Sequence, residues 1–536
     1  MSTASQEAPP DRNLRQIRVA ALVLIAVSVC FRFWRLSTVP GLNGDEAQYG
    51  FEAHSLLAGN GLDWITPNFS LLSPVYLAPS ILLNALFPPS VLVLRSLAVA
   101  SGIAALAVNF VLCRRLLGES AAIGSTLLLA VLPADIAVSR FGCVQCASLL
   151  TDLPVVYGAL ELALGQAMTV RVIARNLLFC LLAVLLHLPN LLAALLFLVA
   201  AAYRLLPALR RWVSSPAKMG LVAAVAVVVV LALVAAPHAL RQQSRYAAQM
   251  RSLPNRGLVL GYANFFSGRN AFEYVAGLRQ PLRGVDWADA VSIAPWAAIA
   301  IWLVASWRGK GRFALDDVDR IVASGWMLQL VAFAVLVGPS GLLPKMDRYA
   351  LCLIVPAVLL CIRFLERVRQ TIDAKQWAVW ALLLILCSVS LASFKLCYFD
   401  PILRTGGESE EAFRAGPIDP KEAAVDMIVN QCPAGSPILI ATHSWWTYAP
   451  ARYFSARYPQ VSVLLSGAPD AAGRVRSALL KGQLWTMEMA SERETRRTSV
   501  NRSFQWWFGA TTDYSGRLVV LVGHPLVTPV GSEGKL

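Results

Sequence analysis

The chain has 536 residues, of which 57% are hydrophobic and only 15% charged, and its mean hydropathy is +0.58. Soluble domains carry about 25% charged residues, so this composition excludes a soluble enzyme. The formal net charge is +15, and in a membrane protein such an excess of Lys and Arg is typical of cytoplasmic loops and not of nucleic-acid binding.

The first apolar run, Val19 to Phe33, follows Arg12, Arg15 and Arg18. Because positive charge is retained in the cytoplasm, this order predicts a cytoplasmic N-terminus and a first helix that exits outward. The run ends in Arg32-Phe33-Trp34-Arg35 and lacks a small-residue cleavage site. We therefore expect an uncleaved membrane helix and not a signal peptide.

Further apolar runs approach the roughly 20 residues that a helical membrane crossing needs. They lie at about 75–87, 91–113, 119–138, 147–165, 176–203, 217–236, 289–307, 321–338, 349–366 and 376–397. Together with the first helix they predict a polytopic α-helical membrane protein with about 11–13 membrane helices.

Two of these runs are irregular. Run 176–203 is too long for one crossing and is interrupted at His187-Leu188-Pro189-Asn190, where proline kinks or ends a helix, so it can form two short helices. Run 75–87 is short and ends at Pro88-Pro89. It is either a full crossing, a re-entrant piece or a helix at the membrane interface.

Arg-rich connections indicate which loops are cytoplasmic. They lie at 204–218, 308–312 and 363–375. Their positions place residues 237–288, the connection Pro344–Tyr349 and everything after Cys397 on the outer, extracytoplasmic side of the membrane.

The composition becomes polar after Cys397, which divides the chain into a membrane domain at 1–397 and an extracytoplasmic, periplasmic domain at 398–536. The second part alternates helix and strand patterns, so we expect a small α/β domain. The expected helices are at 421–431, 445–457 and 471–481, and the expected strands are at 437–442, 461–465, 483–488 and 517–523. We assign its pairs Trp445-Trp446 and Trp506-Trp507 a structural role.

The first outer loop, at about 35–74, contains the sequence G-D-E-A-Q-Y-G at 44–50. Asp45 and Glu46 would open an amphipathic helix, where the positive helix end favours carboxylates. Adjacent carboxylates can accept a proton, bind a divalent cation or orient a sugar. The alternative is a pair that only caps the helix.

This segment, directly after the first membrane helix, resembles the D-E-x-x-Y segment of the polyprenyl-phosphate-sugar glycosyltransferases. That superfamily, GT-C, includes protein O-mannosyltransferases and the lipid A aminoarabinose transferase. The resemblance covers about residues 15–400. Other features that agree, in the same order, are Leu72–Tyr76, Arg95, Ser139-Arg140, Phe266–Arg269 with Tyr274 and Gly277, and Asp347-Arg348-Tyr349.

The resemblance implies an enzyme that moves a sugar from a polyprenyl-phosphate donor to a glycan, lipid or protein acceptor. The reaction would take place at the outer face of the cytoplasmic membrane, by an inverting displacement. The family's first-loop acid maps to Asp45, with Glu46 as its neighbour, and Tyr49 belongs to the same segment. No P-loop or dinucleotide motif is present in the sequence, and a lipid-activated donor needs none.

The other residues of the predicted site are expected to bind the donor substrate. Arg269, Lys345 and Arg348 are candidates for the donor phosphate, because cationic side chains bind phosphate oxygens. Their alternative is snorkelling to the interface. Tyr349 either hydrogen-bonds the phosphate or belongs to the interfacial aromatic belt.

The resemblance also assigns Arg140 to substrate binding, but the second acid that the family often carries after this arginine is replaced by Gln145. Gln145 can still hydrogen-bond substrate, whereas Asp152, further on, either acts in its place or orients its own helix. This departure puts a metal site in doubt, and a divalent cation with Asp45 as ligand stays an open alternative.

Two other classes of function remain. A transporter or flippase would also have many spans and intramembrane charges, although no internal repeat supports it. A non-catalytic relative acting in cell-envelope assembly is suggested by Gln145 at the second acidic position.

Overall fold

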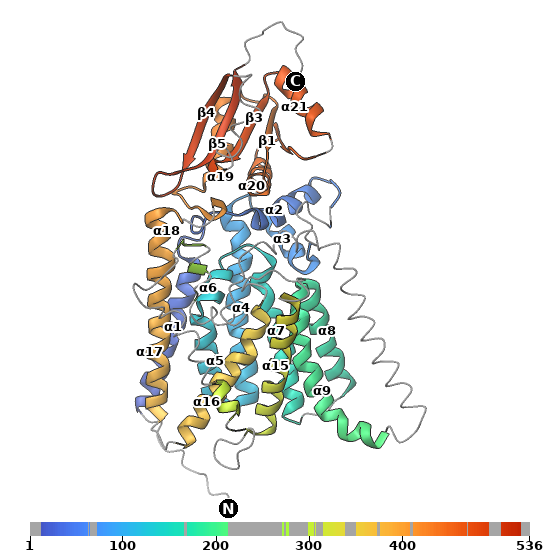
Figure 1. The fold of residues 1–536 in the computed structure, drawn as a ribbon, viewed down its shortest axis with the longest axis vertical. Helices are drawn as coiled ribbons and strands as arrows, with labels where there is room; N and C mark the ends of the chain where they lie inside the picture. The colour runs from blue at the N-terminus through green and yellow to red at the C-terminus, as the bar shows by residue number, and fades with distance from the viewer. Residues whose placement is uncertain are drawn as a thin grey trace, which may run out of the picture.

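The computed structural model describes residues 12–62, 64, 72–165, 169–212, 268, 271–272, 275–277, 299–304, 306, 315–337, 350–371, 376–407, 411–468, 470–491 and 505–526. It consists of a bundle of long helices with a small sheet domain seated on one end (Figure 1). The predicted architecture, a helical membrane part followed by an α/β domain, is confirmed.

The helices of the bundle run mostly along its long axis (Figure 1). Their bounds are α1 Arg12–Phe33, α2 Gly44–Leu57, α3 Pro74–Leu86, α4 Val91–Leu117, α5 Glu119–Val131, α6 Pro133–Val138, α7 Ser148–Ala163, α8 Val170–Leu186, α9 Leu191–Trp212, α15 Asp317–Val337, α16 Ile354–Thr371, α17 Gln376–Phe394 and α18 Asp400–Thr405. Short 3-10 helices lie at Val144–Ala147, Leu188–Asn190 and Leu351–Leu353, and a π-helical turn at Lys395–Phe399 joins α17 to α18.

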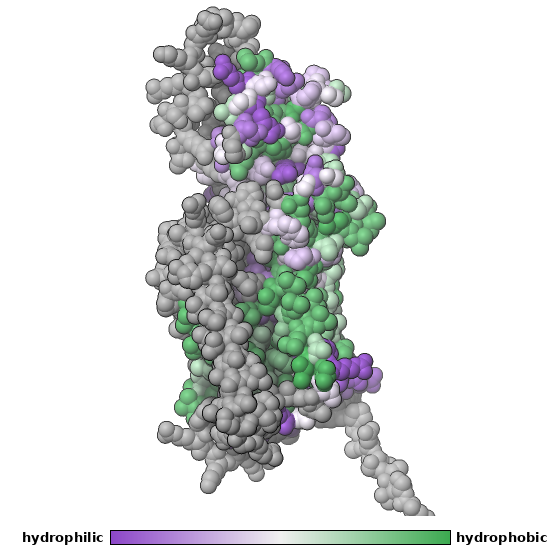
Figure 2. Space-filling model, turned by 90° about the vertical axis from the view of Figure 1, so that its right-hand side faces the viewer, coloured by the Kyte–Doolittle hydropathy of each residue, from purple (hydrophilic) through white to green (hydrophobic). Residues whose placement is uncertain are grey.

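Within the described residues, five helical stretches are long and apolar enough to cross a membrane. They are Arg15–Phe33, Val91–Leu117, Val144–Ala163, Asp317–Val335 and Trp377–Thr405. Large apolar side chains such as Val111, Leu181 and Leu386 point outward on the bundle, more than half exposed. Figure 2 shows apolar residues gathered over the bundle and polar residues over the C-terminal domain, as a lipid-facing surface requires.

Several predicted spans can be compared directly with the structure. The predicted interruption of run 176–203 is confirmed, because α8 ends at Leu186 and α9 begins at Leu191. Run 119–138, expected as one span, is divided into α5 and α6 at Leu132-Pro133, where the proline has no N–H for a helix hydrogen bond. Span 217–236 lies outside the described residues, as does most of 289–307.

Run 75–87, predicted as a full crossing, a re-entrant piece or an interfacial helix, corresponds to α3. It has 13 residues with Pro79 inside, which is shorter than the roughly 20 that a crossing needs. Tyr76 and Leu77 of α3 pack with Tyr49 of α2 in one apolar cluster. In Figure 1, α2 and α3 lie together between the bundle and the sheet domain.

The C-terminal domain is a five-stranded mixed sheet with helices. The sheet order is β2-β1-β3-β5-β4, with β1 parallel to β2 and β3, and β5 antiparallel to β3 and β4. The bounds are α19 Pro420–Gln431, β1 Ile438–Thr442, α20 Trp445–Ser455, β2 Val461–Leu465, α21 Ala471–Leu480, β3 Leu484–Met489, β4 Gln505–Thr512 and β5 Leu518–Leu526. Seven of these elements match the predicted ones closely, and β4 was not predicted.

The sheet domain and the bundle share one apolar core. Leu42 and Phe51 of the α2 region pack in the same cluster as Val425 of α19 and Phe454 of α20. At the same seam the backbone N–H of Ser90 donates to the Tyr453 hydroxyl at 2.9 Å. The domain is therefore held against one end of the bundle by buried contacts and not by a linker alone.

Candidate functional site

Arg95, near the start of α4, holds the loop that leads to the acidic pair. Its guanidinium is fully buried and donates to the carbonyl oxygens of Leu36 at 2.9 Å and of Pro40 at 2.8 Å. Buried backbone carbonyls need hydrogen-bond partners, and a guanidinium supplies five donors in a fixed fork. Arg95 of α4 therefore fixes the loop before α2 through these two hydrogen bonds.

Arg140 holds the same loop from the end of α6. It donates to the carbonyls of Arg32 at 3.1 Å, Trp34 at 2.8 Å and Val39 at 2.6 Å, so it satisfies orphan carbonyls at the C-terminal end of α1. Burial lowers the pKa of Arg140 to about 10, which leaves it charged at neutral pH. In this structure the Arg140 guanidinium positions the loop between α1 and α2, and its predicted contact with substrate stays a prediction.

Glu46 is fully buried and its carboxylate is enclosed by donors. Arg95 binds it bidentately, with Nε 2.8 Å from Oε2 and Nη2 2.9 Å from Oε1. The backbone N–H of Gly142 donates to Oε2 at 2.8 Å. Glu46 also completes a capping box with Asn43, the N-cap of α2. The capping alternative therefore describes Glu46, whose carboxylate anchors α2 to α4 and to the chain after α6.

Asp45 is in a different environment from its neighbour. It lies in the first turn of α2, half-buried, and the Trp445 indole N–H of α20 donates to its Oδ1 at 3.3 Å. A Cβ on Gly44 would lie 2.7 Å from the Trp445 ring, so the glycine permits this close approach. Of the acidic pair, Asp45 is the carboxylate that faces the seam between the bundle and the C-terminal domain.

Tyr49, predicted with Asp45 as part of the site, follows it by one helical turn. The backbone N–H of Ser73 donates to its hydroxyl at 3.2 Å, and its ring meets the Tyr76 ring edge-on at 4.9 Å. Burial raises the pKa of Tyr49 well above its ordinary value, so the phenol stays neutral. The side chain joins α2 to the start of α3, and its predicted contact with substrate stays a prediction.

Three buried polar side chains lie along the helical stretch that follows Arg140, which consists of the 3-10 helix Val144–Ala147 and α7. Gln145 is buried, and its Oε1 has no hydrogen-bond partner among the described residues. The same holds for the Ser148 hydroxyl and for both carboxylate oxygens of Asp152, which is fully buried. Spacings of three and four residues place all three side chains on one helix face. Buried polar groups without partners are costly and mark functional candidates, so neither Gln145 nor Asp152 is excluded by its surroundings.

The remaining predictions lie outside the described residues. These are Arg269, Lys345, Arg348 and Tyr349. For a divalent cation, the described part of the chain contains no group of three His, Cys, Asp or Glu side chains that could hold one. The Glu46 oxygens are occupied by Arg95, so they do not complete a ligand set with Asp45.

Sequence reasoning missed two residues of this site. Arg95 was noted only as part of the resemblance, although a charged residue inside an apolar run is itself a signal of a functional or structural partner. Trp445 was assigned a structural role, and its ring does meet the Phe51 ring at 6.2 Å. Its contact with Asp45 joins residues 400 positions apart, which no sequence spacing predicts.

No protein-family model and no curated protein matches the sequence. Solved structures do match the fold. The crystal structure of ArnT from Cupriavidus metallidurans bound to undecaprenyl phosphate aligns over 94% of this chain and 97% of its own, with a TM-score of 0.54 and 14% identity. The apo form of that protein gives 0.51 at 15% identity, with the same coverage.

A third match is the archaeal oligosaccharyltransferase AglB from Archaeoglobus fulgidus, in complex with an inhibitory peptide and a dolichol-phosphate. It aligns over 88% of this chain and 70% of its own, with a TM-score of 0.50 and 12% identity. At these identities the likeness concerns the fold. The chain therefore shares its fold with ArnT and with AglB, in agreement with the fold that the sequence resemblance predicted.

Proposed function

We propose that the protein is an integral-membrane glycosyltransferase that moves a sugar from a polyprenyl-phosphate donor to a glycan, lipid or protein acceptor. The observation that carries this proposal is the division of the acidic pair. The Glu46 carboxylate is buried in an ion pair with Arg95. The Asp45 carboxylate is partly exposed at the seam between the bundle and the C-terminal domain, where it accepts a hydrogen bond from Trp445. The fold matches support it, because ArnT was solved with undecaprenyl phosphate and AglB with a dolichol-phosphate.

In the proposed reaction Asp45 takes the proton of an acceptor hydroxyl or amine. The acceptor oxygen or nitrogen forms a bond to the anomeric carbon, while the bond between that carbon and the phosphate oxygen breaks. Polyprenyl phosphate leaves with the bonding electrons, and the configuration inverts. Arg269, Lys345, Arg348 and Tyr349 are proposed to bind the leaving phosphate, where cationic donors stabilise the developing charge.

We place this reaction at the outer face of the cytoplasmic membrane. Helix α1 begins, with Arg15 and Arg18, at the end of the bundle opposite the sheet domain (Figure 1). The C-terminal end of α16 lies at that same end of the bundle (Figure 1). In this helix Arg363 and Arg367 pair with Asp319 of α15 at 2.7 and 3.2 Å. Positive charge at that end supports a cytoplasmic N-terminus and an extracytoplasmic C-terminal domain.

The test is transfer by the full-length protein in membrane vesicles. Each of a panel of radiolabelled polyprenyl-phosphate sugars is supplied with membrane lipids and glycans, and the labelled product is separated. We expect transfer from at least one donor. If no donor yields product while the protein binds a lipid phosphate or moves a solute, the chain is a transporter, a flippase or a non-catalytic relative.

The Trp445 contact gives a more specific prediction. Trp445→Phe removes the hydrogen bond to Asp45 and keeps most of the packing against Phe51. We expect kcat to fall about fivefold, because one hydrogen bond contributes roughly 1 kcal/mol. KM for the donor and the melting temperature should change little. Trp446→Phe is the matched control, and equal losses in both variants would refute a role at Asp45.

A further inference from the structure

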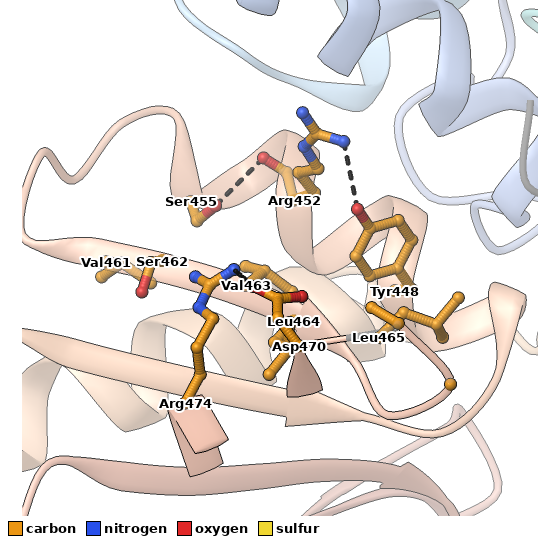
Figure 3. A pocket seen from close by; sticks show the side chains of 12 residues that line it. Tyr448, Arg452, Ser455, Val461, Ser462, Val463, Leu464, Leu465, Asp470 and Arg474 are labelled. Carbon is orange, nitrogen blue, oxygen red and sulfur yellow. Dashed lines mark hydrogen bonds and ion pairs between the residues drawn. The ribbon is translucent and has the colours of Figure 1, made fainter. Parts of the chain in front are cut away.

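The C-terminal domain contains a cavity of about 680 Å³ that the proposed reaction does not use. It lies along β2, the edge strand of the sheet, between α20 and the start of α21 (Figure 3). Apolar side chains of α20 and α21 join two different clusters of the domain, because the helices cover opposite faces of the sheet. The cavity therefore opens at the free edge between the two helices.

The lining of this cavity carries more positive than negative charge. Its charged residues are Arg452, Arg474 and Asp470, so the balance is one positive charge. Arg474 meets Asp470 only loosely, with Nη1 3.7 Å from Oδ2, and both side chains are about half exposed or more. Such an exposed pair contributes little, so Arg474 can turn to an incoming anion.

Arg452 is fixed in place before any ligand arrives. Its Nη1 donates to the Tyr448 hydroxyl at 3.0 Å, and its guanidinium lies 4.6 Å from the centre of the Phe51 ring of α2. Figure 3 shows this guanidinium beside the Tyr448 hydroxyl and Arg474 beside Asp470. A planar guanidinium with donors left over binds carboxylate or phosphate oxygens in pairs.

Helix α20 connects the cavity to the candidate active site. Trp445, Tyr448 and Arg452 are three and seven residues apart, so they lie on one face of the helix. Trp445 contacts Asp45 at one end of this face, and Arg452 lines the cavity at the other. At 1.5 Å per residue the two ends are roughly 10 Å apart, a length that an oligosaccharide spans.

We propose that this cavity is an acceptor subsite for a negatively charged sugar, whose carboxylate or phosphate is bound by Arg452 and Arg474. The acceptor would span the distance from the cavity to Asp45 around Phe51 of α2, whose ring packs against the α20 face that carries Trp445 and Arg452. The inference rests on the proposed sugar transfer and adds the chemical class of the acceptor.

The test is binding without turnover, so that its failure is separate from failure of the transfer reaction. Full-length protein in nanodiscs is titrated calorimetrically with digalacturonate, glucose 1-phosphate and the neutral disaccharide galactobiose, with no donor present. We expect binding of an anionic probe and none of galactobiose. Binding of digalacturonate alone would identify a carboxylate sugar, and binding of glucose 1-phosphate alone a sugar phosphate.

Arg474→Gln should weaken anionic binding about fivefold, because an ion pair at a half-exposed arginine contributes up to about 1 kcal/mol. Arg476→Gln is the matched control, since Arg476 is an exposed arginine of α21 that does not line the cavity. In the transfer assay Arg474→Gln should raise KM for an anionic acceptor and leave kcat unchanged. Equal binding of neutral and anionic probes, no binding of any probe, or equal effects of the two variants would overturn the proposal.

Discussion

Asp45→Asn is expected to reduce sugar transfer by about 10²-fold or more at unchanged protein yield. General-base catalysis contributes roughly 10²–10⁴-fold, and an amide cannot accept the acceptor's proton. The side chain keeps its size and can still accept the Trp445 hydrogen bond, so folding should be preserved. The measurement is the initial rate of transfer from the best donor, with the melting temperature measured on the same sample.

Asp400→Asn provides the matched control for this experiment. Asp400 opens α18 and pairs with Lys395 at 2.9 Å, away from the described site. Its variant should transfer sugar at the wild-type rate. If Asp45→Asn retains that rate as well, Asp45 does not act as the base, and the acceptor must be activated by another group. Asp152 would then be the next carboxylate to replace.

Local patterns were sufficient to predict much of this fold. The interruption at Pro189 and the alternating elements from α19 to α21 follow from apolar periodicity and turn residues that lie close together in the sequence. Strand β4 was missed although its sequence, Q-W-W-F-G-A-T-T, is rich in aromatic residues and is followed by a turn into β5. Those two features together are a hairpin signal that could have found it.

The candidate site was only half predictable, for a physical reason. The position of Asp45 and Glu46 at a helix N-terminus follows from neighbouring residues, as does their ability to cap. Their different roles are set by distant partners. Arg95 is 49 residues from Glu46, and Trp445 is 400 residues from Asp45. Which carboxylate is buried and which is left at the seam depends on this tertiary packing, so two adjacent acids look alike in the sequence.

The buried ion pair between Arg95 and Glu46 fixes this arrangement of the two acids. Arg95→Met should destabilise the protein by about 3–5 kcal/mol, because it leaves the buried Glu46 carboxylate without its partner. The carbonyls of Leu36 and Pro40 lose their donors in the same step. We expect a lower melting temperature and a lower yield of folded protein, measured by thermal unfolding in detergent.

A double variant separates the ion pair from the size of the side chain. Glu46→Gln combined with Arg95→Met removes both charges, so it should regain part of the stability lost in Arg95→Met alone. Arg18→Met is the control, because its pair with Glu119 is half exposed and such pairs contribute at most about 1 kcal/mol. If Arg95→Met costs no more than Arg18→Met, the loop is held by other contacts, and Glu46 becomes available for chemistry beside Asp45.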